Sequence, residues 1–310
     1  MNGAASIPFD RAAHGGKLKE HQEGEPQMDS SAMFAVLRGR SLLLMLLLAT
    51  ALPLLSARFI WPEFFVAEVR SLPDAIVGCA VYVLLASLIW VACKKAGIAD
   101  QISFGHRLNA KQVWIYSLLG IPLVGVSVFG LYSVYLPLSY AWPDFVVFWV
   151  LDVPPLIWWE PRIEAVLASG VNAIVLVAIA PVVEELFFRG FLLNRWHQQY
   201  GPAKAVVFSS MIFALFHVDV VGGLIFGAVL SAIYMKTKSL FGPIVIHMSN
   251  NAIVFVLLLV EGTVYSGTQN WTLDEFRAFW WLGPLGAVIG IPWIVWFFRK
   301  SLHHRQAPST

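Results

Sequence analysis

Long apolar stretches separated by short polar segments run along most of the chain. Eight of them are candidate membrane spans, at residues 41–57, 74–93, 112–135, 164–188, 204–217, 220–235, 243–260 and 279–298. A membrane-spanning helix needs about 20 mostly apolar residues, and fewer where neighbouring helices shield it. The pattern therefore predicts an all-α polytopic membrane bundle of about eight transmembrane helices, covering residues 36–300.

The two ends of the chain are polar. Residues 1–35 carry charged side chains among Gly, Ser and Gln, and they lack the apolar surface that an ordered core requires. We expect them to form a disordered cytosolic tail, with a second cytosolic tail at residues 301–310. The first apolar run, 41–57, resembles a signal peptide, but the long polar segment before it and Leu55 at the would-be cleavage site favour a retained spanning helix.

The stretch 142–159 departs from the pattern of long spans. It is interrupted by two aspartates and two adjacent prolines, namely Asp144, Asp152, Pro154 and Pro155. We therefore predict an interfacial or re-entrant element there, on the non-cytoplasmic side.

Basic side chains concentrate in alternate loops. They are Arg38, Arg40, Lys94, Lys95, Arg107, Lys111, Arg189, Arg195, Lys204, Lys236, Lys238, Arg299, Lys300 and Arg305. Acidic side chains prevail in the other loops, with Arg58, Arg70, Arg162 and Arg277 as departures. Cytoplasmic loops carry an excess of Lys and Arg, so we expect both termini in the cytoplasm, which an even number of spans allows. The short loops favour a bacterial inner membrane.

Composition excludes two broad classes of protein. Hydrophobic residues make up 58% of the 310 residues and charged residues 13%, whereas about a quarter of a typical soluble domain is charged. A net charge of +2 without a long basic tract argues against nucleic-acid binding. Cys79 and Cys93 lie fourteen residues apart in one apolar stretch, about 21 Å along a helix, so they cannot form a disulfide with each other.

Three charged residues interrupt the apolar run 180–195, namely Glu184, Glu185 and Arg189. An ionised side chain at bilayer depth costs about 3 kcal/mol on insertion scales, so charges retained there commonly serve a function. In a helix, Glu185 and Arg189 lie four residues apart on one face and can pair. Glu184 lies about 100° away around the helix. We predict Glu184 as the reactive group and the pair as its support, and the alternative is a buried structural ion pair.

Two histidines lie within or at the end of apolar stretches. His217 follows Phe213 by four residues, and His247 precedes Asn251 by four, so each pair shares a helix face. Polar side chains in lipid tend to face one another inside a bundle, which favours a common site with Glu184. In the predicted topology His217 lies deeper than Glu184 and His247, unless its helix is tilted or starts later than residue 204.

These residues resemble three motifs of the CAAX-processing and bacteriocin-processing (Abi) intramembrane proteases, a family that includes the type II prenyl-protein endopeptidases. The motifs are Glu-Glu-x-x-x-Arg, Phe-x-x-x-His and His-x-x-x-Asn. They stand here, in the same order, as Glu184-Glu185-Leu186-Phe187-Phe188-Arg189, Phe213-Ala214-Leu215-Phe216-His217 and His247-Met248-Ser249-Asn250-Asn251. The resemblance covers about residues 164–261, which we expect to form the catalytic core. It implies an eight-helix bundle with a conical cavity, and hydrolysis of a peptide bond in or next to the membrane.

The resemblance also implies roles for individual residues. It points to Glu184 as the base that activates water, helped by His217, and to His247 and Asn251 as donors to the oxyanion. We expect neutral N–H donors for this last role. A second interpretation is a zinc site with Glu184, His217 and His247 as ligands and a fourth position for water. The cofactor stays open, with zinc as the candidate.

Two other functional classes compete with an intramembrane endopeptidase. One is a catalytically idle membrane scaffold or regulator with the same fold, against which the intact motifs count. The other is a transporter that uses the buried carboxylates as a proton relay, but the sequence lacks the repeated halves that such folds contain. As partners we expect the lipid bilayer and a membrane-associated peptide or protein substrate, which the eukaryotic relatives cleave in prenylated form.

Overall fold

The structure is a computed structural model that describes residues 35–60, 71–264 and 271–303 of the chain. Within these ranges the secondary structure is helical, with no strand. The predicted tails at 1–35 and 301–310 fall almost entirely outside the described residues, as do Arg70 and Arg305. The predicted all-α class is confirmed.

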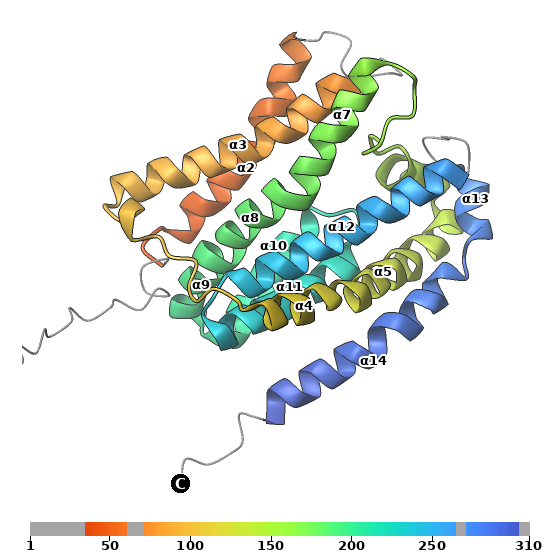
Figure 1. The fold of residues 1–310 in the computed structure, drawn as a ribbon. Coiled ribbons are helices and arrows are strands. Elements are labelled where there is room, and N and C mark those ends of the chain that lie inside the picture. Colours follow the sequence, from red (N-terminus) through yellow and green to blue (C-terminus); the bar gives the residue numbers. More distant parts are fainter. Residues whose placement is uncertain (1–34, 61–70, 265–270, 304–310) are drawn as a thin grey trace, which may run out of the picture.

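The helices form one bundle, shown in Figure 1. They are α2 (Gly39–Ile60), α3 (Ser71–Lys95), α4 (Ala110–Leu118), α5 (Gly120–Ala141), α6 (Pro143–Val146), α7 (Ile163–Ile174), α8 (Ala180–Glu185), α9 (Leu193–Tyr200), α10 (Pro202–Leu215), α11 (Val220–Thr237), α12 (Phe241–Val264), α13 (Leu273–Ala278) and α14 (Leu282–His303). A short 3₁₀ turn lies at Ala99–Gln101, and π-helical turns lie at Val147–Leu151, Val175–Ile179 and Leu186–Leu192.

Seven helical segments of the described part are long and apolar enough to cross a membrane. They are Gly39–Ala57, Ser71–Lys95, Ala110–Ala141, Ile163–Tyr200, Val220–Thr237, Phe241–Val264 and Leu282–Arg299. The eighth predicted span, 204–217, corresponds to α10, which has 14 residues and a length of about 21 Å. A helix of this length is shorter than the hydrocarbon core of about 30 Å. Within the described ranges the bundle therefore has seven full-length candidate spans, and the eighth predicted span is a shorter helix.

The hairpin between α9 and α10 explains how His217 comes to lie at the depth of Glu184. Gly201 joins α9 to α10 with a φ of 81°, a left-handed conformation that favours glycine, and the two helices pack against each other. Glu184 lies seventeen residues before Gly201 and His217 sixteen residues after it. On two antiparallel arms these positions lie at similar depth, so the mismatch expected for a full-length fifth span does not arise.

The residues from Ile163 to Tyr200 form one long helical rod that crosses the bundle, with α2 and α3 on one side and α10 to α12 on the other (Figure 1). Pro181 lacks an N–H, and the π-helical turn at Val175–Ile179 directly precedes this part of the rod. The second π-helical turn begins directly after Glu185. Wide turns of this kind frequently occur at functional sites.

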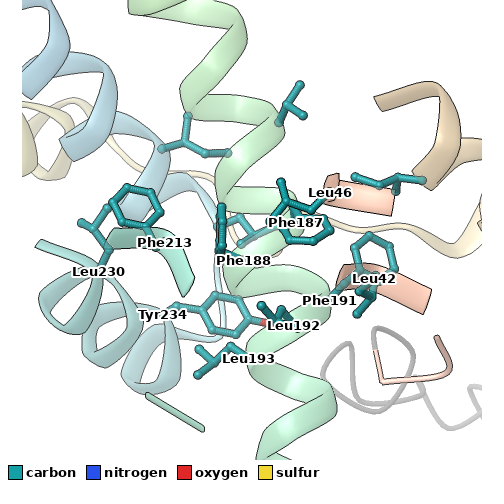
Figure 2. Packing of buried hydrophobic residues seen from close by; sticks show 14 of the residues in the cluster. Leu42, Leu46, Phe187, Phe188, Phe191, Leu192, Leu193, Phe213, Leu230 and Tyr234 are labelled. Atoms are coloured by element: carbon teal, nitrogen blue, oxygen red, sulfur yellow. The ribbon is translucent and has the colours of Figure 1, made fainter. Parts of the chain in front are cut away.

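The largest buried hydrophobic cluster surrounds the same rod. Phe187 and Phe191 face Leu42 and Leu46 of α2, while Phe213 of α10 packs on the opposite side (Figure 2). Between helices in lipid such side chains stabilise the fold through close packing rather than through removal from water. The rod is therefore fixed from both sides immediately next to Glu184 and Glu185.

The stretch predicted to be interfacial or re-entrant contains α6 and the π-helical turn Val147–Leu151, and it is not among the candidate spans. Its buried residues Val146 and Leu151 pack in one cluster with Tyr132 of α5 and Phe276 of α13. The stretch thus packs against α5 and α13.

Candidate active site

Glu184 takes its contacts from two other helices. Its Oε1 accepts a hydrogen bond of 2.7 Å from the hydroxyl of Tyr82 in α3, and its Oε2 lies 3.9 Å from Nε2 of His247 in α12. The carboxylate is buried, with 8% of the residue exposed. Oε2 receives no hydrogen bond from the described residues. As predicted, Glu184 has no hydrogen-bond partner in its own helix, and its Oε2 has no hydrogen-bond partner among the described residues.

Glu185 forms the predicted pair with Arg189. Glu185 Oε1 accepts a hydrogen bond of 2.6 Å from Arg189 Nη1, and both residues are almost fully buried. Arg189 Nη2 donates to the carbonyl of Gly227 at 3.3 Å, and its guanidinium lies 4.6 Å from the ring centroid of Phe213. The pair thus links the rod to α10 and α11.

A second contact of Glu185 fixes the tautomer of His247. Nδ1 of His247 lies 2.8 Å from Glu185 Oε1, the oxygen that also accepts from Arg189. An ionised carboxylate only accepts hydrogen bonds, so Nδ1 carries the proton. Nε2 of neutral His247 is then an acceptor. The donation to the oxyanion that is expected of His247 stays a prediction, and through Nε2 it requires that both ring nitrogens are protonated.

The backbone fixes the tautomer of His217 in the same way. Its Nδ1 lies 2.8 Å from the carbonyl oxygen of Phe213, and the two rings stack with centroids 4.2 Å apart. A carbonyl only accepts, so Nδ1 donates and Nε2 of the neutral ring is left as an acceptor. This arrangement suits His217 to accept a proton or to orient a water molecule.

A cavity of about 250 Å³ lies beside these residues. Its polar lining includes His217, His247, Asn250 and Asn251, and its apolar lining includes Phe213 and Phe226. Glu184 does not line this cavity, although it lies next to His247, which does. The structure therefore brings His217, His247 and Asn251 to one cavity and places Glu184 directly behind its wall.

The described residues do not offer zinc a ligand set. No three His, Cys, Asp or Glu side chains among them are grouped so that they could hold a metal ion. Nδ1 of His247 and Nδ1 of His217 are both engaged within the protein, which is the usual arrangement of a histidine whose Nε2 binds a metal. As they are placed, however, Glu184, His217 and His247 are not grouped so that they could hold zinc, and no step below passes through a metal.

Several residues at the site were not predicted from the sequence, among them Tyr82, Asp219 and Asn250. Tyr82 bonds to Glu184, and Asp219 lines the cavity while its Oδ1 accepts from the backbone N–H of Gly222 at 2.9 Å. One tyrosine in an apolar stretch carries no signal that separates it from a packing residue. Asp219 had a signal, since an aspartate directly before an apolar helix is a typical N-cap.

Comparisons with known proteins concern the central part of the chain. Residues 167–253 match the family described as type II CAAX prenyl endopeptidase Rce1-like. The protein named "Putative membrane peptidase YdiL" from Bacillus subtilis (strain 168) is 26% identical over 100 residues, which are 31% of this chain and 41% of that protein. The chain thus matches about two fifths of that relative's length. No solved structure matches the chain significantly.

The matched range includes all three motifs, and of their residues Phe213, His217, His247 and Asn251 line one cavity. The resemblance seen in the motifs is confirmed over residues 167–253, which match the model of the type II CAAX prenyl endopeptidase Rce1-like family.

Proposed function

We propose that the protein is an intramembrane endopeptidase that hydrolyses a peptide bond in or next to the bilayer, with Glu184 as the base that activates water. The observation that carries this proposal is the free Oε2 of Glu184, held by Tyr82 on its other oxygen and directed to within 3.9 Å of His247. A buried carboxylate with one oxygen anchored and one unpartnered is suited to take a proton from water.

The proposed reaction is an ordinary hydrolysis. Water attacks the carbonyl carbon of the substrate, and Glu184 takes its proton, with His217 Nε2 as the acceptor that orients the water. The oxyanion accepts hydrogen bonds from doubly protonated His247 and from Asn251, which has two N–H groups and uses one on the carbonyl of Leu176 at 2.9 Å. When the C–N bond breaks, the proton on Glu184 passes to the leaving amine.

The position of Glu184 behind the cavity wall sets a requirement. Water must reach the carboxylate past His247, or the side chain must rotate into the cavity when substrate binds. Apo geometry in catalytic sites is often loose and tightens in the complex, so this requirement does not argue against the role.

The substrate in this proposal is a membrane-associated peptide or protein. The family description includes prenylated substrates, and we keep a prenyl group as the finer proposal. Comparing the cleavage rates of a prenylated peptide and its unprenylated counterpart tests whether the substrate must carry a prenyl group. We also propose that both termini are cytoplasmic and that the protein lies in a bacterial inner membrane, on the loop charges given above.

One observation favours the second candidate function, a catalytically idle scaffold or regulator. Glu185, Arg189 and His247 form a buried network that would hold the helices together with or without catalysis. In that case Glu184 contributes only its bond to Tyr82.

The test is to compare the N-termini of membrane-associated proteins in cells that express the wild type, Glu184→Gln or the control Glu164→Gln. Glu164 is exposed and lies in the same rod, far from the site. We expect a set of cleaved N-termini that disappears with Glu184→Gln and persists with Glu164→Gln. An identical set in all three cells overturns the endopeptidase proposal and leaves the scaffold.

A further inference from the structure

Helix α12 presents two consecutive asparagines to the cavity, and only the second belongs to the motif. Both Asn250 and Asn251 line the cavity, and 8% of Asn250 is exposed. An asparagine amide has a donor end and an acceptor end, so the hydrogen bonds of each side chain determine which end is left without a partner.

A backbone carbonyl fixes both orientations. The Nδ2 group of Asn251 lies 2.9 Å from the carbonyl oxygen of Leu176, which can only accept, so the NH₂ end faces it. The Oδ1 of Asn251 then faces the other way and accepts from Nδ2 of Asn250 at 3.2 Å. This chain of two amides starts in the π-helical turn Val175–Ile179 of the rod that carries Glu184. It leaves the Oδ1 of Asn250 as its free end.

The free oxygen is buried and lacks a donor. No hydrogen-bond donor among the described residues reaches Asn250 Oδ1. Nearly all buried polar atoms in proteins have a partner, so an unpaired carbonyl oxygen on a residue that lines a cavity points to a ligand that donates a hydrogen bond. An acceptor fixed in this way cannot turn its NH₂ toward the cavity without losing the bond to Asn251.

We propose that Asn250 Oδ1 is a substrate-binding site that accepts a hydrogen bond from one backbone N–H of the peptide. This inference rests on the proposed function, since the peptide is the substrate of the proposed hydrolysis. The ligand class is a peptide with a free amide hydrogen at that position. Proline and other N-alkylated residues lack this hydrogen, so they are excluded there.

The probe is a synthetic peptide that spans a cleavage site found in the comparison of wild type and Glu184→Gln. In a series of analogues, each non-scissile amide near that site is replaced by an ester, which removes one N–H. We expect one ester to raise the KM of the wild type about tenfold, the effect of one lost hydrogen bond to a buried group. In Asn250→Leu the KM is already raised, and the same ester has no further effect.

Two further variants keep the result interpretable. Asn250→Ala serves if Asn250→Leu folds poorly, as judged by elution as a single species in detergent. Val254→Ala changes an apolar residue of the same cavity and keeps the pair of asparagines, so it retains the ester effect.

The outcomes separate this inference from the proposed function. Glu184-dependent cleavage with the same ester effect in the wild type and in both Asn250 variants overturns the inference alone. Cleavage that does not depend on Glu184 overturns both.

Discussion

The hydroxyl of Tyr82 donates a hydrogen bond of 2.7 Å to Oε1 of Glu184. Tyr82 lies in α3, outside the range 167–253 that matches the family. The helices before the matched range therefore contribute a contact to the site and do not serve only as packing.

The bond between Tyr82 and Glu184 leads to the first prediction. Tyr82→Phe removes only the hydroxyl, so the protein should fold normally while the Glu184 carboxylate loses its anchor. Hydrogen bonds to charged groups contribute about 1.5–3 kcal/mol, so we expect kcat to fall at least about tenfold with little change in KM. The measurement is the steady-state cleavage rate of the purified protein.

The control for this variant is Tyr140→Phe, because Tyr140 is 67% exposed and lies away from the site. In the background of Glu184→Gln, Tyr82→Phe should have no further effect, since the two residues act as a unit. A wild-type kcat for Tyr82→Phe contradicts the positioning role.

Arg189 provides a prediction about stability. Arg189→Ala leaves Glu185 as an uncompensated buried charge, which costs on the order of 3 kcal/mol. We expect a lower yield of folded protein and a lower midpoint of thermal unfolding, together with lost activity. Lys204→Ala, at an exposed position, is the control. Normal yield with lost activity would instead indicate that Arg189 contacts the substrate.

The packing of α14 against α5 provides a third prediction. A Cβ added at Gly286 would lie 2.5 Å from the carbonyl oxygen of Gly125, whereas one added at Gly170 would meet nothing within 4 Å. Overpacking costs about 1–3 kcal/mol, so Gly286→Ala should lower the midpoint of thermal unfolding. Gly170→Ala should leave it unchanged or raise it, because alanine favours a helix. Equal midpoints for the two variants argue against the close contact.

Metal removal tests the zinc alternative. The absence of a three-residue ligand group in the described ranges leads us to expect cleavage that persists after treatment with a strong chelator. Metal analysis should find no stoichiometric zinc in the wild type, and His217→Ala should not change the metal content. Zinc bound one to one and lost in that variant supports the metal mechanism.

The sequence predicts local relationships better than contacts between helices. The positions of the apolar stretches agree with the observed helices, and the pairing of Glu185 with Arg189 follows from helical spacing alone. The bonds of Tyr82 to Glu184 and of His247 to Glu185 depend on how separate helices are rotated and offset. Hydrophobic periodicity gives no information on these quantities.

The length of α10 shows a second limit of sequence reasoning. The pattern of apolar runs predicts 204–217 as one of eight spans, but α10 ends at Leu215 after 14 residues. An apolar run at the lower limit of length is compatible with a full span and with a short helix shielded by its neighbours. The hairpin at Gly201 decides between them, and it brings His217 to the site.

The most direct test of the central claim measures hydrolysis by the purified protein in water enriched in ¹⁸O. With the peptide identified as above, the wild type should release a fragment whose new carboxylate carries one ¹⁸O atom, and Glu184→Gln should release almost none in the same time. A labelled fragment formed at the same rate by Glu184→Gln would contradict the claim that Glu184 activates the attacking water.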